Sequence, residues 1–184
     1  MSKHVLVLVS KKVLILSASP RKGGNSDLLC DQFAKGAEEA GHQVEKVCLR
    51  DRKINGCLGC GACQRNGGTC VQKDDMEKIY AAIERADVIV ESFPLYFYGL
   101  PGTLKTMTDR CLPYTKAYGW SKGTQHELRD PKMLEKRLVL ISTCWHTGIE
   151  QLYAAVRAEF DLICGGKYET IFCPQGELFV IESI

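Results

Sequence analysis

Residues 13–26 read Val-Leu-Ile-Leu-Ser-Ala-Ser-Pro-Arg-Lys-Gly-Gly-Asn-Ser, and this stretch decides the fold. Its first part, residues 13–17, is the continuous apolar run that a strand buried on both faces requires. A short turn rich in Gly follows. Asn25 or Ser26 can cap the next helix, whose apolar residues recur at helical spacing up to Ala37. A buried strand, a polar turn and a helix form the opening unit of an α/β sheet.

The rest of the chain repeats this alternation. We expect further strands at 44–49, 88–93, 138–142 and 168–173, and helices at 74–86, 103–112 and 149–163. Right-handed crossovers between parallel strands leave few topologies, and five strands fit the order 2-1-3-4-5. The predicted fold class is therefore α/β: a three-layer, doubly wound parallel sheet with helices on both faces.

The length of 184 residues corresponds to about one domain, and no linker divides the chain. We expect a single domain over residues 1–184. Within it, residues 1–11 form an N-terminal extension, residues 50–73 a cysteine-rich loop and residues 174–184 an atypical tail. Residues 4–10 nearly duplicate 12–17 and could add an edge strand, and residues 179–181 could form another. Because only eleven residues follow Cys173, the final covering helix is expected to be missing, and a partner subunit could cover that face.

The charge balance excludes one class of partner. There are 24 Lys and Arg residues against 22 Asp and Glu residues, so the formal net charge is only +2, whereas a protein that grips nucleic acid shows a basic excess. The apolar runs are far shorter than the roughly 20 residues of a membrane-spanning helix. We therefore expect a cytoplasmic protein that binds neither nucleic acid nor membrane.

The turn after the first strand is the leading candidate for a ligand site. In this strand order, ligands bind at the carboxyl ends of strands one and three. The turn offers hydroxyls, an amide and a guanidinium, and backbone N–H groups at a helix start favour an anion. It matches neither the Walker loop nor the GxGxxG fingerprint, so one terminal phosphate fits better than a pyrophosphate. The alternative is a polar turn that only caps a helix. The candidate residues are Ser17, Ser19, Pro20, Arg21, Asn25 and Ser26.

Two further loops follow strands on the same edge. Residues 94–99 are unusually aromatic, and flat rings beside a phosphate site could stack on a planar heterocycle, the alternative being core packing of Phe97 and Tyr98. Residues 143–148 could supply hydroxyls and an aromatic wall. His146 is a weak candidate for an acid or base, because a lone loop histidine is more often a hydrogen-bonding or exposed residue. The candidates in these loops are Pro94, Leu95, Tyr96, Phe97, Tyr98, Gly99, Thr143, Trp145, His146 and Gly148.

Four of the ten cysteines fall within fourteen residues, with the spacing C-x2-C-x2-C-x6-C. In a reducing compartment such a cluster indicates metal or redox chemistry rather than structural disulfides. Four thiolates at this spacing can hold a cubane iron–sulfur cluster, or zinc, although structural zinc more often uses two separated pairs. Free or paired thiols are the third interpretation. The candidate ligands are Cys57, Cys60, Cys63 and Cys70; the six scattered cysteines fit small buried apolar residues.

Together these motifs resemble the flavodoxin-like NAD(P)H-dependent FMN reductases, in the branch that includes the iron–sulfur flavoproteins. The matching segments are residues 19–26, the four clustered cysteines, and residues 73–76, 94–96 and 104–110, and the resemblance covers about residues 12–173. It departs at the missing final helix and at residues 114–135, which do not align.

The resemblance implies roles for these segments. The first loop would hold the FMN phosphate, and residues 94–99 and 143–148 would border the isoalloxazine ring and ribityl chain. Lys105, Asp109 and Arg110 would be structural or interface-forming. Members of the family are usually dimers or tetramers with FMN near the subunit boundary, so we expect a homodimer or homotetramer.

The function implied is that of an FMN-dependent oxidoreductase. NAD(P)H would give a hydride to the flavin, and electrons would pass to a small acceptor such as a quinone or free flavin, by way of a [4Fe-4S] cluster if the four cysteines hold one. The cofactor performs this chemistry, so no catalytic side chain is required. The alternatives are a non-catalytic flavin or iron–sulfur electron carrier or redox sensor, and a zinc-stabilised binding module without flavin.

Overall fold

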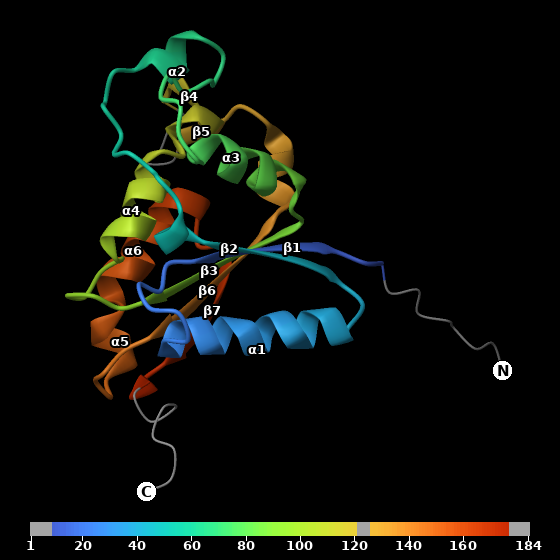
Figure 1. Cartoon of the computed structure of the whole chain (residues 1–184). Coiled ribbons are helices and arrows are strands. Elements are labelled where there is room, and N and C mark those ends of the chain that lie inside the picture. The colour runs from blue at the N-terminus through green and yellow to red at the C-terminus, as the bar shows by residue number, and fades with distance from the viewer. Residues whose placement is uncertain (1–8, 121–125, 177–184) are drawn as a thin grey trace, which may run out of the picture.

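A computed structural model describes residues 9–120 and 126–176 of the chain (Figure 1). Five parallel strands form one sheet in the order β2-β1-β3-β6-β7. This is the predicted order 2-1-3-4-5, with two extra strands that lie outside the sheet, so the expected α/β doubly wound fold is confirmed. The strands are β1 (Lys12–Ser17), β2 (Gln43–Cys48), β3 (Val88–Pro94), β6 (Arg137–Thr143) and β7 (Tyr168–Cys173).

The helices cover the two faces of the sheet unequally. Helix α1 (Asn25–Glu39) lies on one face, and α3 (Met76–Arg85), α4 (Gly102–Asp109) and α6 (Ala154–Cys164) lie on the other (Figure 1). Val13 and Ile15 of β1 pack in the apolar cluster beneath α1, whereas Leu14 and Leu16 pack in the larger cluster on the opposite face. Because both faces of β1 are buried, its sequence is apolar at every one of these positions.

The helix boundaries differ from the expected ones in three places. The N-cap of α1 is Gly24, without a side-chain cap, so the prediction that Asn25 or Ser26 caps this helix is wrong: both residues already lie in its first turn. The helix expected over 103–112 ends at Asp109. The helix expected over 149–163 is divided into α5 (Ile149–Leu152) and α6, with Tyr153 between them. The Tyr153 side chain is buried and its hydroxyl bonds Ser142 Oγ at 3.1 Å.

Residues 114–135, for which the sequence shows no period, contain a small antiparallel ribbon of β4 (Thr115–Trp120) and β5 (His126–Leu128). A 3₁₀ turn, η2 (Leu112–Tyr114), precedes it, and η3 (Pro131–Glu135) follows it. The ribbon lies with the short helix α2 (Ala62–Arg65) of the cysteine-rich loop, beyond α3 and away from the sheet (Figure 1). The ribbon is held by contacts with the cysteine-rich loop, which is distant in sequence, so no local sequence pattern predicts it.

The expected strands at residues 4–10 and 179–181, and the expected lack of a final helix, fall largely or wholly outside the described residues. Among the described helices, α1 alone covers its face of the sheet, and Ile171 of β7 is exposed. None of the helices in residues 9–120 and 126–176 is both long and apolar enough to cross a bilayer.

Candidate functional site

The three loops singled out in the sequence leave one edge of the sheet side by side. The backbone N–H of Ala18, just after β1, donates to the carbonyl of Ser92 in β3 at 2.7 Å. The N–H of Leu95, just after β3, donates to the carbonyl of Thr143 at the end of β6 at 2.9 Å. The strand order therefore brings residues 17–26, 94–99 and 143–148 together at the carboxyl edge.

A buried carboxylate, Asp27, closes the loop between β1 and α1. One of its oxygens accepts a hydrogen bond from Ser17 Oγ at 2.8 Å, and the other accepts one from the N–H of Gly23 at 3.0 Å. Lys46 Nζ of β2 lies 2.8 Å from Asp27 Oδ1, and the Arg50 guanidinium lies 3.4 Å from Oδ2. Asp27 thus joins both ends of the loop to the neighbouring strand.

The ionisation of Asp27 follows from these contacts. Burial by itself would raise the pKa of Asp27, but hydrogen bonds from Lys46, Gly23 and Ser17, with the charge of Lys46, lower it to about 2. Burial would lower the pKa of Lys46, but its hydrogen bonds to Asp27 and Asp31 raise it overall. The pair is therefore charged at neutral pH, and the loop is held by an ionic contact as well as by neutral hydrogen bonds.

The loop packs so tightly around residue 24 that this position has no room for a Cβ atom. Ser19 Oγ and the N–H of Gly24 both donate to the carbonyl of Arg21, at 2.8 Å and 3.2 Å. A Cβ atom on Gly24 would lie 2.9 Å from Ser19 Oγ. The first N–H groups of α1 have no partner within the helix, as at any helix start. Oδ1 of Asn25 is buried without a partner among the described residues.

The six residues predicted for this loop therefore divide by role. The hydroxyls of Ser17 and Ser19 are used inside the protein, so they shape the loop. Ser26 is buried, and its carbonyl accepts a hydrogen bond from Ser92 Oγ at 2.8 Å. Pro20 and Arg21 are exposed at the rim, and the amide of Asn25 has an unused end.

The aromatic segment forms a tight, strained turn. Tyr96 and Gly99 exchange backbone hydrogen bonds at 3.1 Å and 3.0 Å, and the central residues Phe97 and Tyr98 have φ angles of 47° and 66°. Such left-handed conformations cost a non-glycine residue about 1–2 kcal/mol each. Phe97 is 98% exposed and Tyr98 54% exposed, so the alternative that they pack in the core is wrong. The turn holds aromatic rings in solvent beside the β1–α1 loop.

The third loop reaches the first through the chain that follows β7. Thr143 is buried, whereas Trp145, His146 and Gly148 are exposed. The N–H of Gly176 donates to the carbonyl of Cys144 at 3.0 Å. A Cβ atom on Gly176 would lie 2.9 Å from Thr143 Cβ and 3.6 Å from Asn25 Cβ. Residue 176 therefore lies between the first and third loops.

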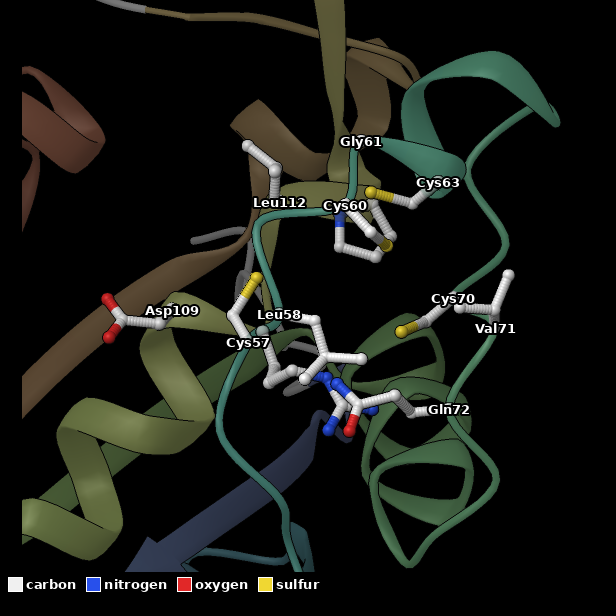
Figure 2. A pocket seen from close by; sticks show the side chains of 12 residues that line it. Cys57, Leu58, Cys60, Gly61, Cys63, Cys70, Val71, Gln72, Asp109 and Leu112 are labelled. Atoms are coloured by element: carbon white, nitrogen blue, oxygen red, sulfur yellow. The ribbon is translucent and has the colours of Figure 1, made fainter.

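The four clustered cysteines line a small pocket of about 20 Å³ that is partly open to solvent (Figure 2). All four thiols are free. Figure 2 shows the sulfur atoms of Cys63 and Cys70 turned toward the segment that carries Cys57 and Cys60. Burial, and then the charges of Cys70, Cys57 and Cys60, raise the pKa of Cys63, so the four side chains are close enough to interact. Nevertheless, in the described part of the chain no three metal-ligating side chains converge on a single ion.

The ribbon that the sequence did not predict supports this pocket. Gln64 of α2 donates to the carbonyl of Leu112 at 2.8 Å. Arg129, just after β5, donates to the carbonyls of Pro113 and Cys63 at 3.0 Å and 3.4 Å. Gly68 has a φ angle of 97°, and a Cβ there would lie 2.8 Å from the Pro113 carbonyl oxygen. The insert therefore holds the cysteine-rich loop in place.

Arg110 and Asp74 form a buried ion pair beneath the same pocket. Both side chains are 1% exposed, and the guanidinium contacts the two carboxylate oxygens at 2.8 Å and 3.2 Å. Arg110 also lines the pocket, and its Nη1 donates to the carbonyl of Asn55 at 2.7 Å. These contacts are of the structural kind that the resemblance implies for Arg110. Lys105 and Asp109, by contrast, form an exposed pair one turn apart.

Helix α4 joins the two sites. It begins just after the aromatic turn, at Gly102, and ends at Asp109, which lines the cysteine pocket. Eight helical residues at 1.5 Å each span about 12 Å.

Both cofactors that the resemblance implies fit the residues present. The β1–α1 loop offers N–H groups at a helix start for a phosphate and, in Asn25 Oδ1, a buried acceptor without a partner for a ribityl hydroxyl. The cysteine pocket offers four thiols, the donor set of an iron–sulfur cluster.

The comparisons with known proteins agree with this geometry. Residues 11–163 match the NADPH-dependent FMN reductase family. An iron–sulfur flavoprotein of Archaeoglobus fulgidus is 40% identical over 103 residues, which are 56% of this chain and 46% of that protein. The chain spans about half the length of the proteins of this name that it matches.

Solved structures show the same fold. An NAD(P)H:quinone oxidoreductase from Methanothermobacter marburgensis matches with a TM-score of 0.68 and 23% identity, over 95% of this chain and 87% of that one. An FMN-dependent NADH-azoreductase from Bacillus anthracis, solved in complex with FMN, matches with a TM-score of 0.62 and 16% identity, over 90% and 87%. At these identities the likeness concerns the fold. Since the family match covers most of the sheet and the β1–α1 loop, the chain belongs to the NADPH-dependent FMN reductase family.

Proposed function

We propose that the protein is an FMN-dependent oxidoreductase that takes a hydride from NAD(P)H and passes electrons to a small acceptor such as a quinone or free flavin. The observation that carries the proposal is the β1–α1 loop, which is closed by Asp27, has no room for a Cβ at residue 24 and lies beside the aromatic turn. The proposal treats residues 1–184 as one domain of a cytoplasmic homodimer or homotetramer.

The residues act by binding and orienting, since a bound flavin supplies hydride and electron transfer itself. The N–H groups at the start of α1 and the Asn25 amide would hold the phosphate and ribityl chain, with Arg21 at the rim. Tyr96, Phe97, Tyr98 and Trp145, which are all exposed, would flank the ring system. His146 is exposed, and the proposal gives it no proton to transfer.

We further propose that Cys57, Cys60, Cys63 and Cys70 hold a [4Fe-4S] cluster. Their common pocket and the names of the relatives support this assignment. Structural zinc more often uses two separated pairs of cysteines than the C-x2-C-x2-C-x6-C spacing found here.

Anaerobically purified protein tests both parts. We expect flavin absorption bands, iron and acid-labile sulfide, and steady-state oxidation of NADPH or NADH with a quinone as acceptor. Flavin with no turnover would instead support an electron carrier or redox sensor, and colourless protein with stoichiometric zinc would support a binding module.

Substitution separates the cysteines. Cys60→Ser removes one proposed ligand, and we expect loss of bound iron. Cys164→Ala removes a half-buried thiol on α6, outside the pocket, and should retain iron. Equal iron content in the two variants would reject Cys60 as a ligand.

A further inference from the structure

We propose that Arg110 donates a hydrogen bond from Nε to the group held by the four pocket cysteines and thereby raises its reduction potential. This inference rests on the proposed function, because it assumes that the cysteines hold an iron–sulfur cluster. It gives the buried Arg110 side chain a second role beside its ion pair with Asp74.

The starting observation is an unused donor. Nη1 of Arg110 donates to the Asn55 carbonyl and to Asp74, and Nη2 donates to the other oxygen of Asp74. Nε is buried and has no partner among the described residues. Native proteins rarely leave a buried N–H unpaired, and a charged donor is the most costly kind to leave so.

The pocket is the place where that donor can find an acceptor. Arg110 lines it together with all four cysteines. The guanidinium cannot turn away, because Asp74 grips its two terminal nitrogens. Asp74 is in turn fixed by the backbone N–H groups of Asn55 and Met76, at 2.9 Å and 3.1 Å. These contacts use three of the five guanidinium N–H groups, which leaves the Nε N–H and one N–H of Nη2 free, and Nε is the buried nitrogen that makes no hydrogen bond at all among the described residues.

A purely structural role does not need Nε. The ion pair, the Asn55 contact and the hydrogen bond from Tyr80 to the Arg110 carbonyl all use other atoms. A lysine at this position could face Asp74 with its charge, but it carries no second N–H along its stem. Arg110→Lys therefore separates the two roles.

The direction of the effect follows from charge. One-electron reduction of a bound cluster, with the electron supplied by NAD(P)H through the flavin of the proposed function, would form and break no covalent bond and would increase the negative charge on the sulfur atoms. An N–H that points at a sulfur stabilises the reduced state more than the oxidised one. Hydrogen bonds to the sulfurs are among the features that set cluster potentials. Removing the donor should therefore lower the potential.

Arg65 provides a matched control. It is an exposed residue of α2, its Nη2 donates to the carbonyl of Cys60 at 3.1 Å, and it is not among the pocket-lining residues. Redox titration of holoprotein, followed by EPR, should give a lower midpoint potential for Arg110→Lys, with the wild-type value in Arg65→Lys. Equal potentials for wild type and an iron-bearing Arg110→Lys would overturn the inference.

A second measurement does not depend on the folding of Arg110→Lys. In wild-type protein grown with arginine labelled with ¹⁵N in the guanidinium group, pulsed EPR of the reduced state should show a ¹⁵N coupling. The coupling should persist in Arg65→Lys and Arg129→Lys. Its absence from iron-bearing wild type, or its loss in either control, would overturn the role of Arg110. Wild type without iron would instead overturn the proposed cluster itself.

Discussion

Lys46 Nζ lies 2.8 Å from Oδ1 of Asp27, so an ion pair joins strand β2 to the first turn of α1. The same carboxylate accepts hydrogen bonds from Ser17 at the end of β1 and from Gly23 within the loop. One buried side chain therefore fixes the loop that we assign to the flavin phosphate.

Asp27→Asn should weaken both the fold and flavin binding. Breaking a buried ion pair is strongly destabilising, and we expect a loss of about 3 kcal/mol in the free energy of unfolding, measured in urea. Asp31→Asn is the matched control, because Asp31 bonds the same lysine from an exposed position, and it should cost less than about 1 kcal/mol. Equal losses in the two variants would contradict the role of Asp27.

The Asp27–Lys46 ion pair also predicts that the free energy of unfolding falls at acid pH. The pKa of Asp27 is about 2 in the folded protein against an ordinary 3.8, so its stabilisation is present above pH 3.8 and is lost as the pH falls through 2. Between these values the wild type should lose stability more steeply than Asp27→Asn.

Glu91 predicts a pH dependence of opposite sign. It lies in the middle of β3 between Leu16 and Leu140, and its Oε2 is buried without a partner among the described residues. Burial, and then the charge of Glu159, raise the pKa of Glu91 to about 7 from 4.5. The folded state therefore holds the proton more tightly than the unfolded chain, and stability falls by roughly 3 kcal/mol as pH rises from 4.5 to 7.

Unfolding free energies across this pH range test the assignment. The falling limb should disappear in Glu91→Gln. Glu45→Gln, which changes an exposed glutamate on β2, should retain it. If the free energy of unfolding still falls between pH 4.5 and 7 in Glu91→Gln, a group other than Glu91 is responsible.

Gly24→Ala should weaken FMN binding about tenfold, because the new methyl group would lie 2.9 Å from Ser19 Oγ inside the loop. The backbone itself tolerates alanine, since φ at Gly24 is −70°. Gly36→Ala on the exposed side of the same helix meets no atom within 4 Å and should leave affinity unchanged while stabilising the helix by up to about 1 kcal/mol. In the double variant Gly24→Ala/Ser19→Ala, FMN binding should be partly restored, because the clashing hydroxyl is gone. If Gly24→Ala weakens FMN binding equally with and without Ser19, the packing argument is contradicted.

Phe97→Gly should raise stability and lower function. Glycine adopts the left-handed conformation freely, so relief of strain should add about 1 kcal/mol to the unfolding free energy. Loss of the exposed ring should weaken flavin binding if the turn flanks the isoalloxazine. Leu134→Ala removes another exposed apolar side chain, away from this edge, and should leave flavin binding unchanged. Unchanged flavin affinity in Phe97→Gly would remove the turn from the site.

The fold could be predicted largely because its signals are local. The apolar run of β1, the Gly-rich turn after it and the glycine that ends α6 each mark an element within a few residues. The strand order followed from the handedness of crossovers. It placed the three loops on one edge, where the structure has them.

The rest depends on partners distant in the sequence. Asp27 gives no sign that Lys46 will neutralise it, since the two meet only when β2 pairs with β1. The β4–β5 ribbon is supported by Gln64 and Arg129 rather than by an alternating pattern. The exposure of Phe97 could not be predicted for another reason. Tight turns with two positive φ angles usually carry Asn-Gly at their central positions, and here two aromatic residues occupy these positions.

The most direct test compares the affinity of the apoprotein for FMN and for riboflavin, by quenching of flavin fluorescence. The two ligands differ only in the phosphate that the β1–α1 loop is proposed to hold. Charged hydrogen bonds of this kind are worth about a hundredfold in affinity. We predict that FMN binds about a hundredfold more tightly and that Gly24→Ala reduces the difference. Equal affinities for the two ligands in wild-type protein would contradict the account.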